Sequence, residues 1–138
     1  MPRALLFLML CLPFAAGAQT VSRDDAAAVR KVIEAQIDAF RKDDGPRAFS
    51  YATAGIRMTF GTAENFMEMV KSQYAVVYRP RTIAFEAPVP IDADDLVQPV
   101  RLTDSEGCAW MALYPMQRGP DGVWRTNGCQ LWRVGQET

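Results

Sequence analysis

Residues 112–132, "ALYPMQRGPDGVWRTNGCQLW", have the pattern of a β-hairpin, and the rest of the fold can be worked out from them. Apolar and aromatic residues lie on both sides of a short segment rich in glycine and proline, which is typical of two strands joined by a turn. If residues 119–122 form the loop, Arg118 pairs with Val123, and the register of the two strands follows from that pair.

This register predicts large apolar groups on both faces of the hairpin. One face pairs Trp110 with Leu131, Ala112 with Cys129 and Tyr114 with Asn127, while the other pairs Met111 with Gln130 and Leu113 with Gly128 and places Trp132 near Ala109. An antiparallel sheet with one face in water alternates more cleanly between apolar and polar residues. We therefore expect a second surface, that of another copy of this chain, to cover the outer face. A bulge at Pro115 would exchange the faces beyond it.

The segments before the hairpin change from a helical to a strand-like period near residue 79. The predicted helices are residues 22–45, 46–56 and 62–78, and the predicted strands are residues 81–88, 96–104, 108–118 and 123–133. Helices followed by strands indicate an α+β fold in which the helices pack on one face of an antiparallel sheet.

The first predicted helix has a clear buried side. Val29, Ile33, Ile37 and Phe40 form one apolar stripe at helical spacing. Gln36 falls inside this stripe, so it is the polar group of this helix that we expect to point inward.

The amino-terminal residues have the features of a secretory signal peptide. Arg3 precedes an apolar run at 4–16, and Ala16-Gly17-Ala18 is a cleavage signal of the A-x-A type. The run is shorter than the roughly 20 apolar residues that span a bilayer, so we expect no membrane anchor. We predict a signal peptide at residues 1–18, a single domain at residues 19–138, and export to the periplasm or the medium.

Two cysteines, Cys108 and Cys129, remain in the predicted mature chain. An oxidising compartment favours a disulfide. In the predicted register, however, the two residues lie about 13 Å apart along the strands, whereas a disulfide needs Cα atoms within about 7 Å of each other. We therefore expect two buried thiols and no disulfide.

Composition excludes several classes of function. The chain has 138 residues, a length typical of one domain, and its formal net charge of −1 argues against binding nucleic acid. It contains no histidine, and thus lacks the commonest general base and the commonest metal ligand. We expect no metal ion and no cofactor.

Three stretches resemble a known family: "VIEAQIDAFRKDD", "AFSYATAGIRMTFGTAENFMEMVKSQYAVVYRPRTIAF" and "RLTDSEGCAWMALYPMQRGPDGVWRTNGCQL". They are similar to an uncharacterised group of exported bacterial proteins, domain of unknown function 4864. That group resembles the nuclear-transport-factor-2-like superfamily, which shares the SnoaL-like cone. The resemblance implies three helices wrapped around a strongly curved antiparallel sheet of four or more strands, with a pocket inside and dimerisation through the sheet in many members.

The resemblance implies little about chemistry. Steroid isomerases and polyketide cyclases of the superfamily often use an Asp with a Tyr or His inside the cone. This chain has no histidine, and Asp38 on the first predicted helix is expected to face outward. Both departures weaken the enzyme hypothesis, and a shared fold does not by itself establish a shared function.

Five residues are candidates for the wall of a ligand pocket: Gln36, Tyr74, Trp110, Tyr114 and Asn127. Ligand pockets combine apolar walls with a few polar groups, which this set would provide. The alternative is that Gln36 and the tyrosines make buried hydrogen bonds to the backbone while Trp110 fills the core.

A catalytic version of the pocket would use Tyr51, Tyr74 or Tyr114 as an acid and Glu64 or Glu68 as a base. A carboxylate becomes a useful base when burial raises its pKa toward neutrality. The alternative is that both glutamates lie on the solvated face of the third predicted helix.

Arg79 and Arg81 in "YRPRT" form a candidate anion clamp. The alternatives are that they pair with the acidic turn at residues 92–95 or remain in solvent. That turn lacks the glycine and the distal glutamate of a calcium loop, so we expect it to bind no metal.

The sequence thus favours an exported protein that binds a small apolar ligand without catalysis, or an accessory module of the bacterial envelope. A cofactor-free lyase or isomerase acting in the same pocket is the first alternative. A structural dimeric module whose side chains fill the cone is the second.

Overall fold

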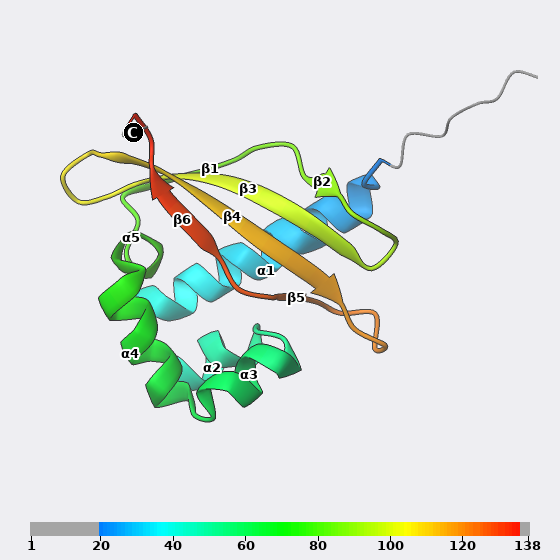
Figure 1. Cartoon of the computed structure of the whole chain (residues 1–138), viewed down its shortest axis with the longest axis horizontal. Coiled ribbons are helices and arrows are strands. Elements are labelled where there is room, and N and C mark those ends of the chain that lie inside the picture. Colours follow the sequence, from blue (N-terminus) through cyan, green and yellow to red (C-terminus); the bar gives the residue numbers. More distant parts are fainter. Residues whose placement is uncertain (1–19, 136–138) are drawn as a thin grey trace, which may run out of the picture.

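A computed structural model describes residues 20–135, so the predicted signal peptide lies outside the described residues. The chain runs from helices to strands (Figure 1). The elements are α1 (Arg23–Arg41), α2 (Gly45–Ser50), α3 (Ala54–Phe60), α4 (Ala63–Gln73), α5 (Ala75–Tyr78), β1 (Thr82–Phe85), β2 (Val89–Pro90), β3 (Asp95–Thr103), β4 (Ala109–Arg118), β5 (Trp124–Thr126) and β6 (Gln130–Arg133).

The strands form one strongly curled antiparallel sheet, and the helices pack against it, as the predicted α+β cone requires (Figure 1). Strands β1, β3, β4 and β5 are neighbours in that order, while β2 pairs with β3 and β6 pairs with β4. The long pair β3–β4 is the centre of the sheet, and α1 crosses one of its faces.

Helix α1 forms, but it ends at Arg41 and not at Gly45, which instead begins α2, because Asp43 between them adopts φ 52°. The N-cap of α1 is Ser22, whose side-chain oxygen accepts a hydrogen bond from the backbone N–H of Asp25 at 3.1 Å. The stripe of Val29, Ile33, Ile37 and Phe40 is buried, which confirms the predicted side.

The second and third predicted helices are each divided in two. Tyr51–Thr53 leave the helical path because this segment pairs with β5: Thr53 N–H donates to the carbonyl of Thr126 at 3.0 Å, and Thr126 N–H donates to that of Tyr51 at 2.9 Å. Tyr74, at φ −131° and ψ 46°, separates α4 from α5. Contacts between distant segments overrode the local helical pattern at the first break.

The hairpin register differs from the prediction at two points. Arg118 pairs with Trp124, not Val123, because the loop extends past Gly122, which adopts φ 77°. A second one-residue shift occurs between β5 and β6, where segment 127–129 contains one residue more than the facing part of β4. Gly128 in this segment adopts φ 101°, and the bulge considered at Pro115 is not the source of the shift.

These two shifts change the predicted partners. The observed pairs are Trp110 with Arg133, Met111 with Trp132, Ala112 with Leu131 and Leu113 with Gln130. Each shift displaces the register by one residue, and the two shifts add. Relative to the prediction, β6 is therefore displaced by two positions along β4, and its side chains keep their predicted faces.

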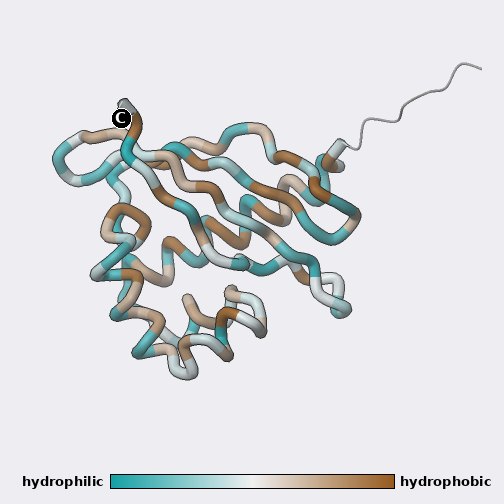
Figure 2. Tube along the Cα trace, viewed as in Figure 1, coloured by the Kyte–Doolittle hydropathy of each residue, from teal (hydrophilic) through white to brown (hydrophobic). Residues whose placement is uncertain are grey.

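Both faces of the β3–β4 pair carry apolar residues, which occur along both strands (Figure 2). Buried and less buried positions alternate along most of each strand. The inner face packs against helices, and its core residues are Leu96, Val100, Leu102, Ala112, Tyr114 and Met116. We define the outer face by the apolar residues Val89, Val97, Pro99, Met111, Leu113, Pro115 and Trp132. The outer-face residues are partly or largely exposed.

Candidate ligand-binding cavity

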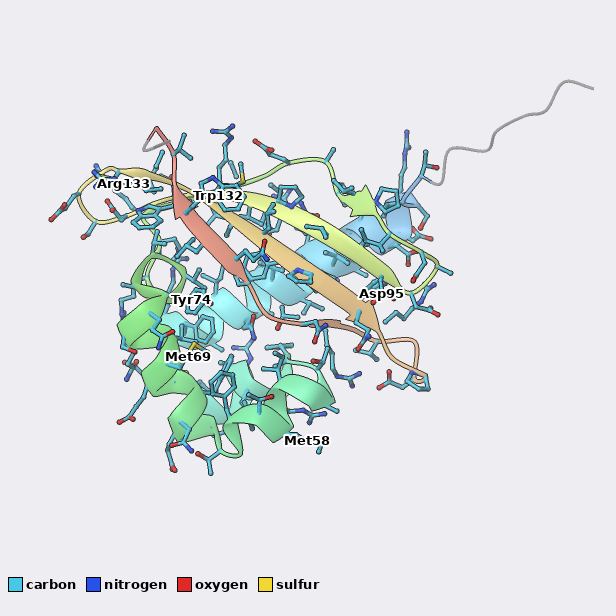
Figure 3. The ribbon with its side chains drawn as sticks, in the orientation of Figure 1. Met58, Met69, Tyr74, Asp95, Trp132 and Arg133 are labelled. Atoms are coloured by element: carbon cyan, nitrogen blue, oxygen red, sulfur yellow. The ribbon has the colours of Figure 1, made fainter. Side chains whose placement is uncertain are left out.

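A cavity of about 370 Å³ lies between the helices and the inner face of the sheet. Figure 3 shows Met69 and Tyr74 on the side of α4 that faces this space. The lining residues are Gln36, Phe40, Ile56, Phe60, Phe66, Met69, Val70, Gln73, Tyr74, Val77, Tyr114, Thr126, Gly128 and Cys129. The volume is within the range of about 300–1,000 Å³ that is usual for small-molecule pockets.

Aromatic rings build much of the wall. The ring of Phe66 on α4 lies 6.0 Å from Phe40, 5.4 Å from Phe49 and 5.8 Å from Phe60, measured between centroids. These tilted and edge-on arrangements are those that aromatic pairs favour. Phe66 therefore connects α1, α2 and α3 to α4.

Tyr114 is the unusual polar group of the cavity. Its side chain comes from the inner face of β4 and is 2% exposed, and its hydroxyl has no hydrogen-bond partner within the described residues. Leaving such a group buried and unpaired costs about 1–3 kcal/mol. Burial, and then the neighbouring Cys129, raise the pKa of Tyr114 well above its ordinary value of 10, so the hydroxyl stays neutral and can donate.

The other polar lining groups are neutral. The Gln36 side-chain amide donates to the carbonyl of Ala48 at 3.1 Å, and the Thr126 hydroxyl donates to the carbonyl of Tyr51 at 3.3 Å. Burial raises the pKa of the Cys129 thiol to about 12, so it is protonated at neutral pH and is a poor nucleophile.

The fourteen described residues that line the cavity include no Asp, Glu, Lys or Arg. Glu64 and Glu68 are exposed and outside the lining, and Tyr51 is also outside, its hydroxyl accepting from Arg47 at 3.3 Å. The structure therefore does not bring the proposed acid and base together. Asp38, expected to face outward, pairs with Lys42 and Arg47 and lies outside the lining.

Three of the five pocket candidates, Gln36, Tyr74 and Tyr114, line the cavity. Trp110 instead borders a neighbouring groove, and its indole N–H donates to Asp104 at 3.0 Å. Asn127 is exposed, and its side-chain oxygen accepts from the Thr53 hydroxyl at 2.8 Å. The extra loop residue explains this last position, because a shift of one residue places Thr126 opposite Met116 on the inner face and turns Asn127 to the other side, where its N–H donates to the carbonyl of Pro115 at 2.8 Å.

The two arginines of the proposed anion clamp have different surroundings. Arg79 donates to Asp43 at 3.1 Å and lies over the ring of Tyr78, while Arg81 is exposed. Neither pairs with the acidic turn at 92–95, whose Asp94 is bound by Arg118 instead. Both candidates lie outside the cavity.

Cys108 and Cys129 are not bridged. Both are half-buried in contrast to the full burial expected, and the guanidinium of Arg133 lies 2.9 Å from the Cys108 sulfur. Within residues 20–135, no group of three or more His, Cys, Asp or Glu side chains is placed to hold a metal. No helix in this same range is both long and apolar enough to cross a membrane.

Sequence reasoning missed several lining residues. Ile56 and Phe60 come from α3, which was expected to end before Phe60, and Cys129 was treated only as a disulfide candidate. Their apolar character was visible, but nothing local showed that α3 would turn toward the sheet.

Two solved structures share this arrangement of helices and curled sheet. A ketosteroid isomerase-like protein from Erwinia carotovora atroseptica has a TM-score of 0.54 and 14% identity, with 83% of this chain and 99% of that chain covered. Aln2 from a Streptomyces species has a TM-score of 0.58 and 17% identity, with 83% and 94% covered. The fold is thus of the kind seen in these two proteins, a curled antiparallel sheet with helices packed against it.

The match to a family model is more specific than the likeness in fold. Residues 22–138 match the family model described as Domain of unknown function (DUF4864), and the chain belongs to this family. No curated protein matches the chain. The likeness to the two solved structures, at such low identity, shows the fold alone.

Proposed function

We propose that this protein binds a small, largely apolar ligand in the cavity between α4 and the sheet, without catalysing a reaction. The observation that carries the proposal is the apolar, aromatic-walled space, together with the lining residue Tyr114, whose hydroxyl is buried without a partner among the described residues. A ligand atom that accepts a hydrogen bond from this hydroxyl removes the cost of burying it alone.

Binding is favoured over catalysis because the described lining of the cavity lacks a base. General acid–base catalysis needs a group that accepts a proton at a stated position on the substrate. The lining supplies a neutral tyrosine, a protonated thiol and amides, and none of its described residues is a carboxylate. The isomerase alternative is supported only by the shared fold, and the filled-cone alternative is disfavoured by the space itself.

The proposal includes export and self-association. The apolar segment at the start of the chain supports export to the periplasm or the medium. The outer face supports a homodimer, because Trp132 and Val89 are 47% and 49% exposed while neighbouring apolar residues are half-buried. A contiguous exposed apolar patch is typical of an interaction site.

Binding of N-phenyl-1-naphthylamine, a neutral apolar dye whose fluorescence rises in apolar surroundings, tests the cavity. The mature wild-type chain is expected to bind the dye saturably with a stoichiometry near one per chain. Met69→Trp places a larger side chain in the lining and is expected to weaken binding about tenfold or more.

Met58→Trp is the matched control, because Met58 on α3 is 84% exposed and points away from the cavity (Figure 3). This variant makes the same substitution and is expected to bind like the wild type. Unsaturable dye binding, or equal weakening by both substitutions, would refute the proposed site. Mass spectrometry of the chain purified from its native host would then identify the bound molecule.

A further inference from the structure

A groove continues from the cavity on the other side of Tyr74. Its volume is about 300 Å³, and Trp110 and Leu131 form its apolar wall next to the end of α4. The cavity and the groove share two lining residues, Gln73 and Tyr74. The side chains at this junction therefore separate the two spaces.

Tyr74 lies at the break between α4 and α5. Tyr74 ends α4 and precedes α5 with non-helical angles, φ −131° and ψ 46°, and the start of α5 has no side-chain cap. Its ring is half-buried and borders both spaces. A ligand that occupies both spaces therefore has to pass this side chain.

The two ends of the combined space offer different groups to a ligand. Tyr114 and Gln36 line the inner end, where the Tyr114 hydroxyl is buried without a partner among the described residues. At the outer end the indole N–H of Trp110 is already bound to Asp104, so its ring and Leu131 form an apolar strip beside the polar side chains of Ser72 and Gln73. The inner end is suited to a neutral oxygen and the outer end to a hydrocarbon chain.

We propose that the cavity and the groove form one elongated site for a linear lipophile with a neutral carbonyl oxygen at one end. The oxygen accepts a hydrogen bond from Tyr114, and the chain passes Tyr74 and lies on Trp110 and Leu131. This inference rests on the proposed function, because it requires the cavity to bind a ligand. To the proposed function it adds the shape and polarity of the ligand and the direction in which the ligand lies in the site.

A series of methyl ketones tests the length of the site. Displacement of N-phenyl-1-naphthylamine is measured with 2-heptanone, 2-nonanone, 2-undecanone, 2-tridecanone and 2-pentadecanone. Each methylene that becomes buried is expected to raise affinity about threefold to fourfold. In the wild type this increase continues through the long members of the series.

Substitutions in the groove show where the long chains lie. Leu131→Asn is expected to stop the increase for the long ketones while leaving 2-heptanone unchanged, because only the long chains reach β6. Val134→Asn is the matched control, since Val134 is an exposed apolar residue three positions farther along the chain and outside both spaces. Unchanged affinity for the dye and for 2-heptanone verifies that Leu131→Asn has kept its fold.

Replacing the oxygen tests the direction. The wild type is expected to prefer 2-undecanone to 2-methyl-1-undecene, which has a CH₂ group in place of the oxygen, by about five- to tenfold. Tyr114→Phe is expected to abolish this preference. Undecanoate is expected to bind more weakly than the ketone at neutral pH, because the described lining contains no cation to pair with a buried carboxylate.

The outcomes separate this inference from the proposed function. If affinity stops rising at the same chain length in the wild type and in Leu131→Asn, ligands are confined to the cavity, and the elongated site is refuted while the proposed function stands. Equal affinity of the wild type for 2-undecanone and for 2-methyl-1-undecene refutes the proposed direction of the ligand, with its oxygen at Tyr114. If the dye itself does not bind saturably, the proposed function fails.

Discussion

The two faces of the sheet are built from the same strands, but the described part of the chain covers only one of them. On the inner face Val100 and Leu102 are 0% exposed beneath the helices. On the outer face Leu113 is half-buried and Trp132 is 47% exposed. Successive side chains of a strand point to opposite sides of the sheet, so each strand contributes residues to both faces. The comparison teaches that apolar residues on an uncovered face point to a partner outside the chain.

The largest expected effect compares two leucines on neighbouring strands. Leu102→Ala on the inner face is expected to lower the free energy of unfolding by about 2–5 kcal/mol, because it leaves a cavity among buried side chains. Leu113→Ala on the outer face is expected to cost about 1 kcal/mol or less. Urea unfolding at low protein concentration, where copies stay apart, measures both losses. Equal losses would contradict the difference between the faces.

The next prediction concerns association through the outer face. The mature wild-type chain is expected to have twice its monomer mass in light scattering at high micromolar concentration. Trp132→Asp is expected to give the monomer mass, because it places a charge in a desolvated interface. Met58→Asp, at the exposed site on α3, is the control and should leave the mass unchanged. A monomeric wild type would refute the homodimer.

A smaller effect is expected at the hydroxyl of Tyr114. Tyr114→Phe removes a buried group that has no partner among the described residues and is expected to raise the free energy of unfolding of the unliganded chain by up to about 1–2 kcal/mol. Tyr78→Phe is a contrasting control, because the Tyr78 hydroxyl donates to Asp43 and its loss is expected to destabilise. A clear loss of stability in Tyr114→Phe would show that its hydroxyl has a partner in solution.

The smallest predicted effect is a dependence of stability on pH at Asp43. The hydrogen bond from Tyr78, followed by the charges of Lys71 and Arg79, lowers the pKa of Asp43 below its ordinary value of 3.8. A lowered pKa in the folded state stabilises the fold above about pH 3.8, and this contribution disappears as pH falls through the lowered value. Asp43→Asn should therefore lose stability relative to the wild type at pH 6 and converge with it in acid.

Asparagine is a suitable replacement because Asp43 adopts φ 52°, a conformation that asparagine tolerates. Stability is measured by urea unfolding across the acid range up to neutral pH. Parallel curves for the wild type and Asp43→Asn across this range would contradict a role for the Asp43 carboxylate.

Much of the fold was predictable because it depends on local periodicity. The stripe from Val29 to Phe40 specified the buried side of α1, and the change of period near residue 79 separated helices from strands. The register was less predictable, because the loop at Gly122 and the bulge near Gly128 each add one residue. The error of two positions preserved the faces of β6, and apolar residues lie on both faces of the sheet as predicted, whereas the error of one position at β5 reversed its faces.

The cavity was only partly predictable. Gln36, Tyr74 and Tyr114 were identified because each places a polar group within an apolar pattern. Trp110 was expected in the same pocket but borders the adjoining groove, since Tyr74 lies between the two spaces. Which side chains surround a cavity depends on the distance between the helices and the strands that pack on either side of it. The spacing of residues along the sequence does not contain that distance.

By itself, the sequence determined the α+β class, the family, the inward side of α1 and the presence of apolar residues on both faces of the sheet. These features follow from spacing along one chain segment, where side-chain direction repeats with the helix or strand. The tertiary structure alone decided that Tyr51–Thr53 leave the helix to pair with β5, and that the Tyr114 hydroxyl is buried with no partner in the described part of the chain. Both depend on groups far apart in sequence that meet only after the chain has folded.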